Sequence, residues 1–195
     1  MNFCVVSVRE DRQENVESIV RVINSTRHYP EVCNYQDPQS RGSFLSRFPK
    51  FTKDRYASDP HHNFNISRKN GEVGCWLSHI SVWQYIVDSE LEYMLVTEDD
   101  LSITENQLEQ INREISSSNL ELIMLGGWTA CYYISNSGAR KVLDNAEEGF
   151  LHHPVDFYLF SCVEDEIVNG NIGPFIVGQN ESLGSHLDFE VENDS

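Results

Sequence analysis

The sequence has no long hydrophobic run and few basic residues. Nowhere do as many as about 18 apolar residues follow one another, so we expect no helix that spans a membrane. Lys and Arg number 14 against 31 Asp and Glu, which gives a formal charge of −17. A surface this acidic repels phosphate backbones and anionic lipid headgroups, so we expect no nucleic-acid or membrane-surface role. A small phosphorylated ligand in a local basic or metal-neutralised pocket is still compatible with this charge.

Cysteine is scarce and irregularly spaced. The five cysteines are an odd number and form no CxxC pair, which argues against a disulfide framework or a zinc ribbon. The first apolar stretch is only a few residues long before charges follow, too short for the core of a signal peptide. We therefore expect reduced thiols and a cytoplasmic protein.

The remaining composition is that of an ordinary globular chain. With 195 residues, 39% of them apolar and 11% aromatic, we expect a single domain over 1–195 with its own core. The sequence contains neither a GxGxxG fingerprint nor a P-loop, and Gly126 and Gly127 are interpreted as a turn between two strands.

Short apolar runs alternate with stretches of helical periodicity. The runs predict strands over 3–8, 93–97, 121–125 and 131–134, with a short one at 175–177. The periodicity predicts helices over 11–23, 74–89, 104–115, 137–146 and 152–160. This alternation predicts an α/β fold with a mostly parallel central sheet flanked by helices. Residues 29–70 show no sustained period and are predicted to form a long irregular loop or lid, and the acidic tail 188–195 is predicted to fray.

Three consecutive acids, Glu98, Asp99 and Asp100, follow the predicted strand 93–97. Adjacent carboxylates repel one another, so a bound cation would repay the repulsion, and oxygen ligands suit Mn²⁺ or Mg²⁺. In open α/β sheets, ligands bind outside the carboxyl ends of the strands, where these acids fall. The alternative is that the acids open a solvated loop and cap the next turn.

Charged residues also follow the first predicted strand. Arg9 and Arg12 could pair with a phosphate, and Asp11 could bond a ribose or a base edge. The alternative is a polar loop in which Asp11 caps the next helix.

Cys75 and His79 lie four residues apart on one helical face, a spacing that zinc can use. The sequence offers no convincing second pair of ligands. A histidine on the helix surface or in the core is therefore favoured over a zinc ligand.

Taken together, several blocks in order resemble glycosyltransferase family 25, the lipopolysaccharide-biosynthesis and collagen galactosyltransferase group. They comprise VVSVREDR (5–12), GEVGCWLSHISVWQYIV (71–87), YMLVTEDDLSI (93–103), WTACYYISNSGARKVL (128–143) and HPVDFYL (153–159).

The resemblance implies a GT-A-like domain and an inverting transfer of a sugar, often galactose, from a UDP-sugar donor to a carbohydrate or protein-linked acceptor. It implies a DxD-like role for the acid triplet, with Asp100 as the direct Mn²⁺ ligand beside Glu98, and Asp99 facing the donor. His186 is a further candidate for the metal or phosphate site, although a surface histidine explains it equally well. Arg9, Asp11 and Arg12 would face the nucleotide, and Gly74, Ser78 and His79 would line the donor pocket near the sugar.

Inverting transfer also needs a base for the proton of the acceptor hydroxyl. Under the resemblance, Asp156 is the first candidate, and Glu164 and Asp165 are the reserves. Two other interpretations stay open: a degenerate relative that binds a sugar nucleotide or glycan without turnover, and a metal-dependent hydrolase or nucleotidyltransferase that uses the same acids.

Overall fold

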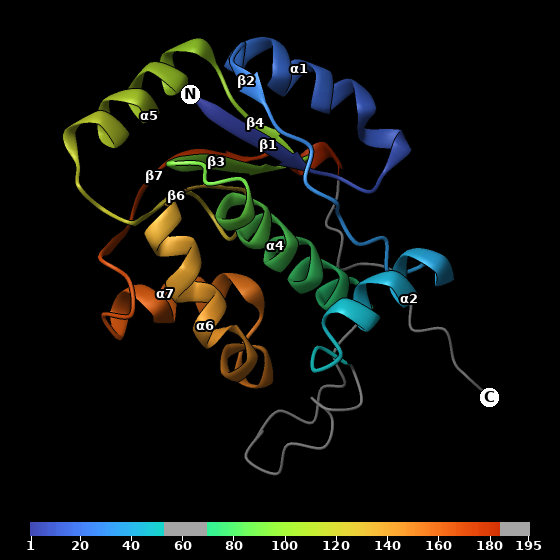
Figure 1. Cartoon of the computed structure of the whole chain (residues 1–195). Coiled ribbons are helices and arrows are strands. Elements are labelled where there is room, and N and C mark those ends of the chain that lie inside the picture. Colours follow the sequence, from blue (N-terminus) through green and yellow to red (C-terminus); the bar gives the residue numbers. More distant parts are fainter. Residues whose placement is uncertain (53–69, 184–195) are drawn as a thin grey trace.

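The structure is a computed structural model that describes residues 1–52 and 70–183 (Figure 1). In chain order the strands are β1 (Asn2–Val6), β2 (Thr26–Arg27), β3 (Tyr93–Glu98), β4 (Leu101–Ser102), β5 (Leu122–Gly126), β6 (Cys131–Ser135) and β7 (Gly170–Gln179). The helices are α1 (Gln13–Ile23), α2 (Pro38–Arg47), α4 (Asn70–Asp88), α5 (Glu105–Ser117), α6 (Asn136–His152) and α7 (Val155–Glu164). Short 3₁₀ turns, η1 and η2, span Glu10–Arg12 and Glu181–Leu183.

The seven strands form a mixed sheet in the order β2-β1-β3-β6-β5-β7-β4. The pairs β1/β2, β1/β3 and β5/β7 are parallel, whereas β3/β6, β5/β6 and β4/β7 are antiparallel. The α/β class is confirmed, and the architecture is consistent with a GT-A-like fold. The sheet is less parallel than predicted because β6 follows β5 through a tight turn and must run back beside it.

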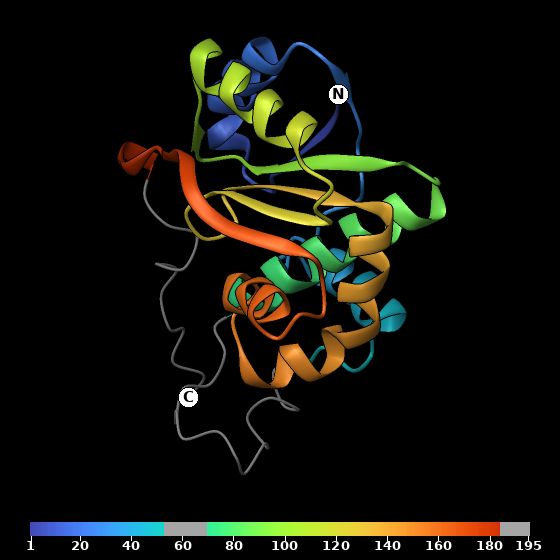
Figure 2. The same cartoon turned by 90° about the vertical axis from the view of Figure 1, so that its left-hand side faces the viewer.

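Helices cover both faces of the sheet (Figures 1 and 2). α1 and α5 lie on one face, and α4, α6 and α7 lie on the other, with α2 beside the start of α4. Successive side chains of a strand point to opposite faces, so the sheet contributes side chains to two hydrophobic cores, one on each face. In β1 and β3, Phe3 and Leu95 pack beneath α1 and α5, whereas Cys4, Met94 and Val96 pack against the α4 layer.

Local capping explains the start of α5 but not that of α1. The predicted capping box at Thr104 and Gln107 is present at the start of α5, where each side chain bonds the backbone of the other residue. Asp11 does not cap α1, which begins after Arg12 and has no side-chain cap. Asp11 instead binds the guanidinium of Arg9.

The prediction of an irregular loop over 29–70 was wrong for α2. This helix buries only one large apolar residue, Phe44, so its sequence has little hydrophobic periodicity. Its start is fixed by Asp37, whose carboxylate accepts hydrogen bonds from the backbone of Gln39 and Ser40, and by Pro38 at the first helical position. The predicted tail 188–195 lies outside the described residues.

Candidate active site

One edge of the sheet collects the carboxyl ends of β1, β3, β5 and β7. β1 and β3 run parallel, with Val6 opposite Glu98. Because β6 is antiparallel to both β3 and β5, β5 points the same way as β3, and β7 runs parallel to β5. The segments that follow these four strands therefore meet, although they are far apart in sequence.

Arg12 binds two acids of the triplet at this edge. Its Nη1 lies 2.6 Å from Asp99 Oδ1 and 3.3 Å from Asp100 Oδ2. All three side chains are buried, and the Oγ of Ser7 donates a 2.7 Å hydrogen bond to Asp99 Oδ2. The repulsion between the two aspartates, which the sequence suggested a metal would relieve, is offset here by a guanidinium.

Backbone groups from the end of β7 complete this ion cluster. The N–H of Asn180 donates to the carbonyl of Asp100 at 2.6 Å, and Arg12 Nη2 donates to the carbonyl of Leu183 at 3.2 Å. From α1, Asn15 donates to the carbonyls of Asp99 and Leu101 at 2.7 and 3.1 Å. Asp99 and Asp100 are thus bound to η1, α1 and the segment that follows β7.

The third acid, Glu98, faces a different set of partners. Its Oε1 accepts a hydrogen bond from the Oγ1 of Thr129 and lies 3.3 Å from Nε2 of His79. The Glu98 side chain is 12% exposed, so it is the acid of the triplet nearest to solvent. The structure therefore separates Glu98 from Asp99 and Asp100 by giving them different partners.

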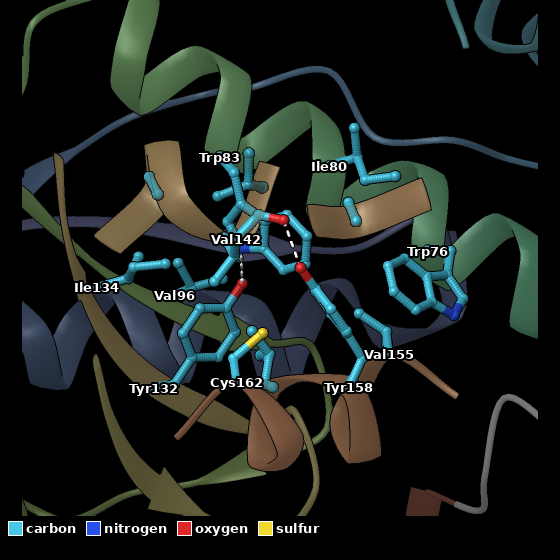
Figure 3. Close-up of a cluster of buried hydrophobic side chains, with 14 of the residues drawn as sticks. Trp76, Ile80, Trp83, Val96, Tyr132, Ile134, Val142, Val155, Tyr158 and Cys162 are labelled. Carbon is cyan, nitrogen blue, oxygen red and sulfur yellow. Dashed lines mark hydrogen bonds between the residues drawn. The ribbon is translucent and has the colours of Figure 1, made fainter. Parts of the chain in front are cut away.

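A buried relay orients His79 toward Glu98. Trp83 Nε1 donates to the hydroxyl oxygen of Tyr132 at 2.9 Å (Figure 3). That oxygen lies 2.8 Å from Nδ1 of His79. When the Tyr132 hydroxyl donates to Nδ1 of His79, the imidazole proton lies on Nε2, and this N–H donates to Glu98. Every polar group of the relay then has a hydrogen-bond partner. Burial raises the pKa of Tyr132, which keeps this hydroxyl protonated.

Asp156 belongs to the same group. It lies in the first turn of α7 and is 9% exposed. Burial raises the pKa of Asp156; the backbone N–H groups at the helix start oppose this rise, and the charge of Glu98 adds to it. A carboxyl group with a raised pKa beside a second carboxylate is a candidate for proton transfer.

The two reserve candidates lie elsewhere. Glu164 and Asp165 are exposed at the opposite end of α7, about 12 Å along the helix axis from Asp156. The structure does not bring them to the Glu98 and Asp156 group.

Arg9 lines an open depression beside the ion cluster. Arg9 pairs with the exposed Asp11, and its hydrogen bond to that carboxylate lowers the pKa of Asp11. The depression has a volume of about 350 Å³ and is lined by Val5, Ser7, Val8, Arg9, Glu10, Gln13, Val16, Arg27, His28, Tyr29, Pro30 and Val32. Its size lies at the lower end of the range for small-molecule sites. A second depression, of about 270 Å³, is lined by Asp144, Glu147 and Glu148 of α6 and is too acidic for a phosphorylated ligand.

Gly74 and Ser78 have structural contacts. A Cβ on Gly74 would lie 3.0 Å from the Cβ of Tyr35, so glycine allows the 33–35 segment to approach α4. The buried Ser78 hydroxyl accepts from the backbone N–H of Cys33 at 2.9 Å and donates to the carbonyl of Gly74. These contacts hold a connection against α4, and their predicted place in a donor pocket stays a prediction.

Two donor sets could hold a metal ion. Asp99 and Asp100 offer only oxygen, which suits Mn²⁺ or Mg²⁺, and Asp100 is the looser partner of Arg12. The other set is Cys75, His79 and Glu98, whose sulfur, nitrogen and oxygen ligand atoms lie within 4.8 Å of one another, and which suits zinc better than manganese. The sequence did not reveal Glu98 as the third member of this set, because only the packing of β3 on α4 brings it to Cys75 and His79. His186 lies outside the described residues.

Sequence reasoning missed Ser7, Thr129 and Tyr132. Thr129 and Tyr132 fall within the block at 128–143, which carried the family resemblance, yet no single residue of it had a stated role. The only sign in the sequence was that they are polar residues in the turn and the strand that follow β5. The order of the strands in the sheet is needed to tell which residues lie beside that position.

Part of the chain is similar in sequence to known proteins. Residues 35–128 match the family described as Glycosyltransferase family 25 (LPS biosynthesis protein). The chain is 33% identical to Procollagen galactosyltransferase 1 of Danio rerio over 132 residues, 52% of this chain and 21% of that protein. It is 32% identical to Procollagen galactosyltransferase 2 of Homo sapiens over 52% of this chain and 20% of that protein. It is 31% identical to Inactive glycosyltransferase 25 family member 3 of Mus musculus over 52% of this chain and 22% of that protein.

The chain therefore spans about a fifth of the length of these relatives. Within the described residues, the helices are all too short or too polar to cross a membrane.

Proposed function

The chain is a relative of glycosyltransferase family 25 over residues 35–128, and from this premise we propose that it is a metal-dependent, inverting glycosyltransferase. The donor is a UDP-sugar, with galactose as the transferred sugar, and the acceptor is a hydroxyl of a carbohydrate or of a protein-linked group. One observation carries the proposal: Ser7 and Arg12, from the connection after β1, both bind Asp99 of the acid triplet. The basic connection and the acids thus form one site.

The donor nucleotide would bind in the depression beside Ser7 and Arg9. Arg9 offers a cationic donor for a diphosphate, and the exposed ring of Tyr29 offers a face for a base. The guanidinium of Arg27 lies 4.8 Å from the centroid of the Tyr29 ring, which limits the positions of that ring. A diphosphate held here would lie beside the triplet, because Ser7 lines the depression and also bonds Asp99.

A divalent metal, Mn²⁺ or Mg²⁺, would be held by Asp100 together with the donor diphosphate. The oxygen donors fit such an ion, and Asp100 can leave Arg12 at the smaller loss because Asp99 keeps the 2.6 Å contact. When bound, the metal would offset the negative charge that develops on the leaving diphosphate.

Asp156 would act as the base. It takes the proton of the acceptor hydroxyl as that oxygen bonds to the anomeric carbon, and the bond from this carbon to the diphosphate oxygen breaks on the opposite side. Glu98 would stay ionised beside Asp156, held by Thr129 and His79, so that its charge favours proton uptake by Asp156.

A second candidate is binding of a sugar nucleotide without turnover. The observation that favours it is the buried pairing of Arg12 with both aspartates, which neutralises the acids that would hold the metal. Several relatives of this chain are themselves named as inactive.

Thermal unfolding with UDP, UDP-galactose, UDP-glucose and GDP-mannose, with and without Mn²⁺, tests the donor site. A ligand at about 100 times its dissociation constant stabilises the folded state by about 2.7 kcal/mol. We expect a UDP shift that requires Mn²⁺ and is lost in Asp100→Asn but kept in Asp144→Asn, an acid of α6 outside the site. A shift that survives Asp100→Asn would contradict the assignment of the triplet.

Product analysis tests turnover. We expect wild-type chain with UDP-galactose and an acceptor to release UDP and a glycosylated product, and Asp156→Asn to lose this activity while it keeps the UDP shift. Pyrophosphate among the products would indicate nucleotidyl transfer instead. A UDP shift without any product would favour the binding-only alternative.

A further inference from the structure

Two exposed aromatic rings lie in the segments that carry Thr129 and Asp156. Trp128 and Phe157 are 51% and 47% exposed, and their ring centroids lie 5.7 Å apart. Trp128 lies in the turn between β5 and β6, and Phe157 lies on α7, so the pair exists only in the folded chain. Phe160 continues the cluster, with its ring centroid 6.1 Å from that of Phe157.

The backbone holds Trp128 in an unfavourable conformation. Its φ is +57°, in the left-handed region that a bulky side chain rarely occupies, within a turn closed by the hydrogen bond from the N–H of Ala130 to the carbonyl of Gly127. Asn or Gly is the usual choice at such a position. Because its backbone is strained and its side chain is half exposed, Trp128 contributes little to the stability of the folded chain. This points to a role outside folding.

Each ring is the sequence neighbour of a polar group of the site. Thr129, which follows Trp128, bonds Glu98, and Asp156 immediately precedes Phe157. The charge of Glu98 acts on Asp156 and contributes to its raised pKa. The aromatic pair therefore belongs to the two segments, the β5–β6 turn and the first turn of α7, that also carry Thr129 and Asp156.

We propose that Trp128 and Phe157 form a stacking platform for the pyranose ring of the acceptor. A pyranose has an apolar face of C–H groups and a rim of hydroxyls, so it matches an aromatic surface bordered by hydrogen-bond acceptors. The planes of the two rings are tilted by 58°, so one ring can offer its face to a sugar while the other borders it. A stable protein partner would bury about 800 Å² on each side, far more than this pair provides.

This platform rests on the proposed function and narrows its acceptor. A sugar on the platform would place a hydroxyl beside Asp156, the proposed base. The acceptor of this chain is accordingly a saccharide and not an amino-acid side chain of a bare peptide.

Tryptophan fluorescence can test the platform without a known acceptor. The chain has three tryptophans, and Trp76 and Trp83 are fully buried, so acrylamide quenching reports on Trp128. Quenching in the sugar-free protein comes first: if Trp128 is already shielded, another part of the chain covers the platform and the proposal fails.

The probes are the methyl β-pyranosides of galactose, glucose and N-acetylglucosamine, compared with a hydroxylysine-containing peptide without sugar. We expect at least one pyranoside to protect Trp128 from acrylamide, and the peptide to give no protection. Phe157→Ala should weaken the binding of the pyranoside by about fivefold, the factor in affinity that corresponds to the loss of one aromatic contact. Phe175→Ala, which removes an equally exposed ring on β7, should leave the affinity unchanged.

Three further results would overturn the platform: no protection by any pyranoside, protection by the peptide alone, or equal losses in the two phenylalanine variants. The UDP-dependent thermal shift is measured in the same proteins. Its absence from the wild type would refute the donor site, whereas a normal shift without sugar protection would refute the platform alone.

Discussion

Asp156 is buried and its pKa is raised, so its titration should change the free energy of unfolding. Below about pH 3.9 the carboxyl is protonated in both the folded and the unfolded chain. Between that value and the raised pKa, the folded chain holds a proton that the unfolded chain has lost, so stability falls as pH rises. Asp156→Asn should therefore be more stable than wild type at neutral pH and should lack this slope in urea unfolding. Equal pH profiles for the two proteins would contradict the assignment.

The backbone strain at Trp128 can be isolated with two substitutions. Trp128→Ala and Trp128→Gly both remove the ring, but only alanine keeps the penalty of the left-handed conformation. We expect the glycine variant to be more stable than the alanine variant by about 1 kcal/mol in chemical denaturation. At Phe175, which does not have a positive φ, the order of the same two variants should reverse. The same order at both positions would argue against strain at Trp128.

At the scale of elements, the connection after β1 is held by Arg12 rather than by a helix cap. Removal of this guanidinium would leave the buried carboxylates of Asp99 and Asp100 without their main counter-charge. We expect Arg12→Ala to lose about 3–5 kcal/mol of unfolding free energy. Arg21→Ala, on the exposed face of α1, should lose less than about 0.5 kcal/mol. Comparable losses in the two variants would show that Arg12 is not the cation on which this cluster depends.

The packing of α6 against α7 depends on the missing side chain of Gly149. A Cβ there would lie 2.0 Å from the ring of Tyr158, and that ring is held by its hydroxyl bond to the carbonyl of Val142 and by Trp76 (Figure 3). We expect Gly149→Ala to destabilise the chain by about 1–3 kcal/mol in thermal or urea unfolding. Gly42→Ala, on the open face of α2, should stabilise it by up to about 1 kcal/mol. A neutral Gly149→Ala variant would mean that Tyr158 can move aside.

At the scale of the whole molecule, the formal charge of −17 acts against the compact state. Dissolved salt screens this repulsion, since the Debye length shrinks to about 10 Å at 0.1 M ionic strength. We expect the unfolding temperature to rise from low to moderate NaCl, and to follow ionic strength when NaCl is replaced by KCl. A fall in unfolding temperature over this range would mean that attractive ion pairs, such as those of Arg12, outweigh the net repulsion.

The sequence by itself determined the α/β class, the positions of most strands and helices, and the presence of three adjacent acids at the end of β3. These features depend on interactions between residues a few positions apart, such as the capping box at Thr104 or the apolar run of β3. The local sequence therefore suffices to predict them. The family resemblance also followed from ordered local blocks.

Only the tertiary structure decided how those acids are used. The order of the strands sends Asp99 and Asp100 to Arg12 and leaves Glu98 to His79, Thr129 and the neighbourhood of Asp156. It also joins Trp128 to Phe157 across 29 positions of the chain. These pairings depend on which strands lie side by side and on which face each helix packs, and a one-dimensional pattern of polar and apolar residues does not specify either.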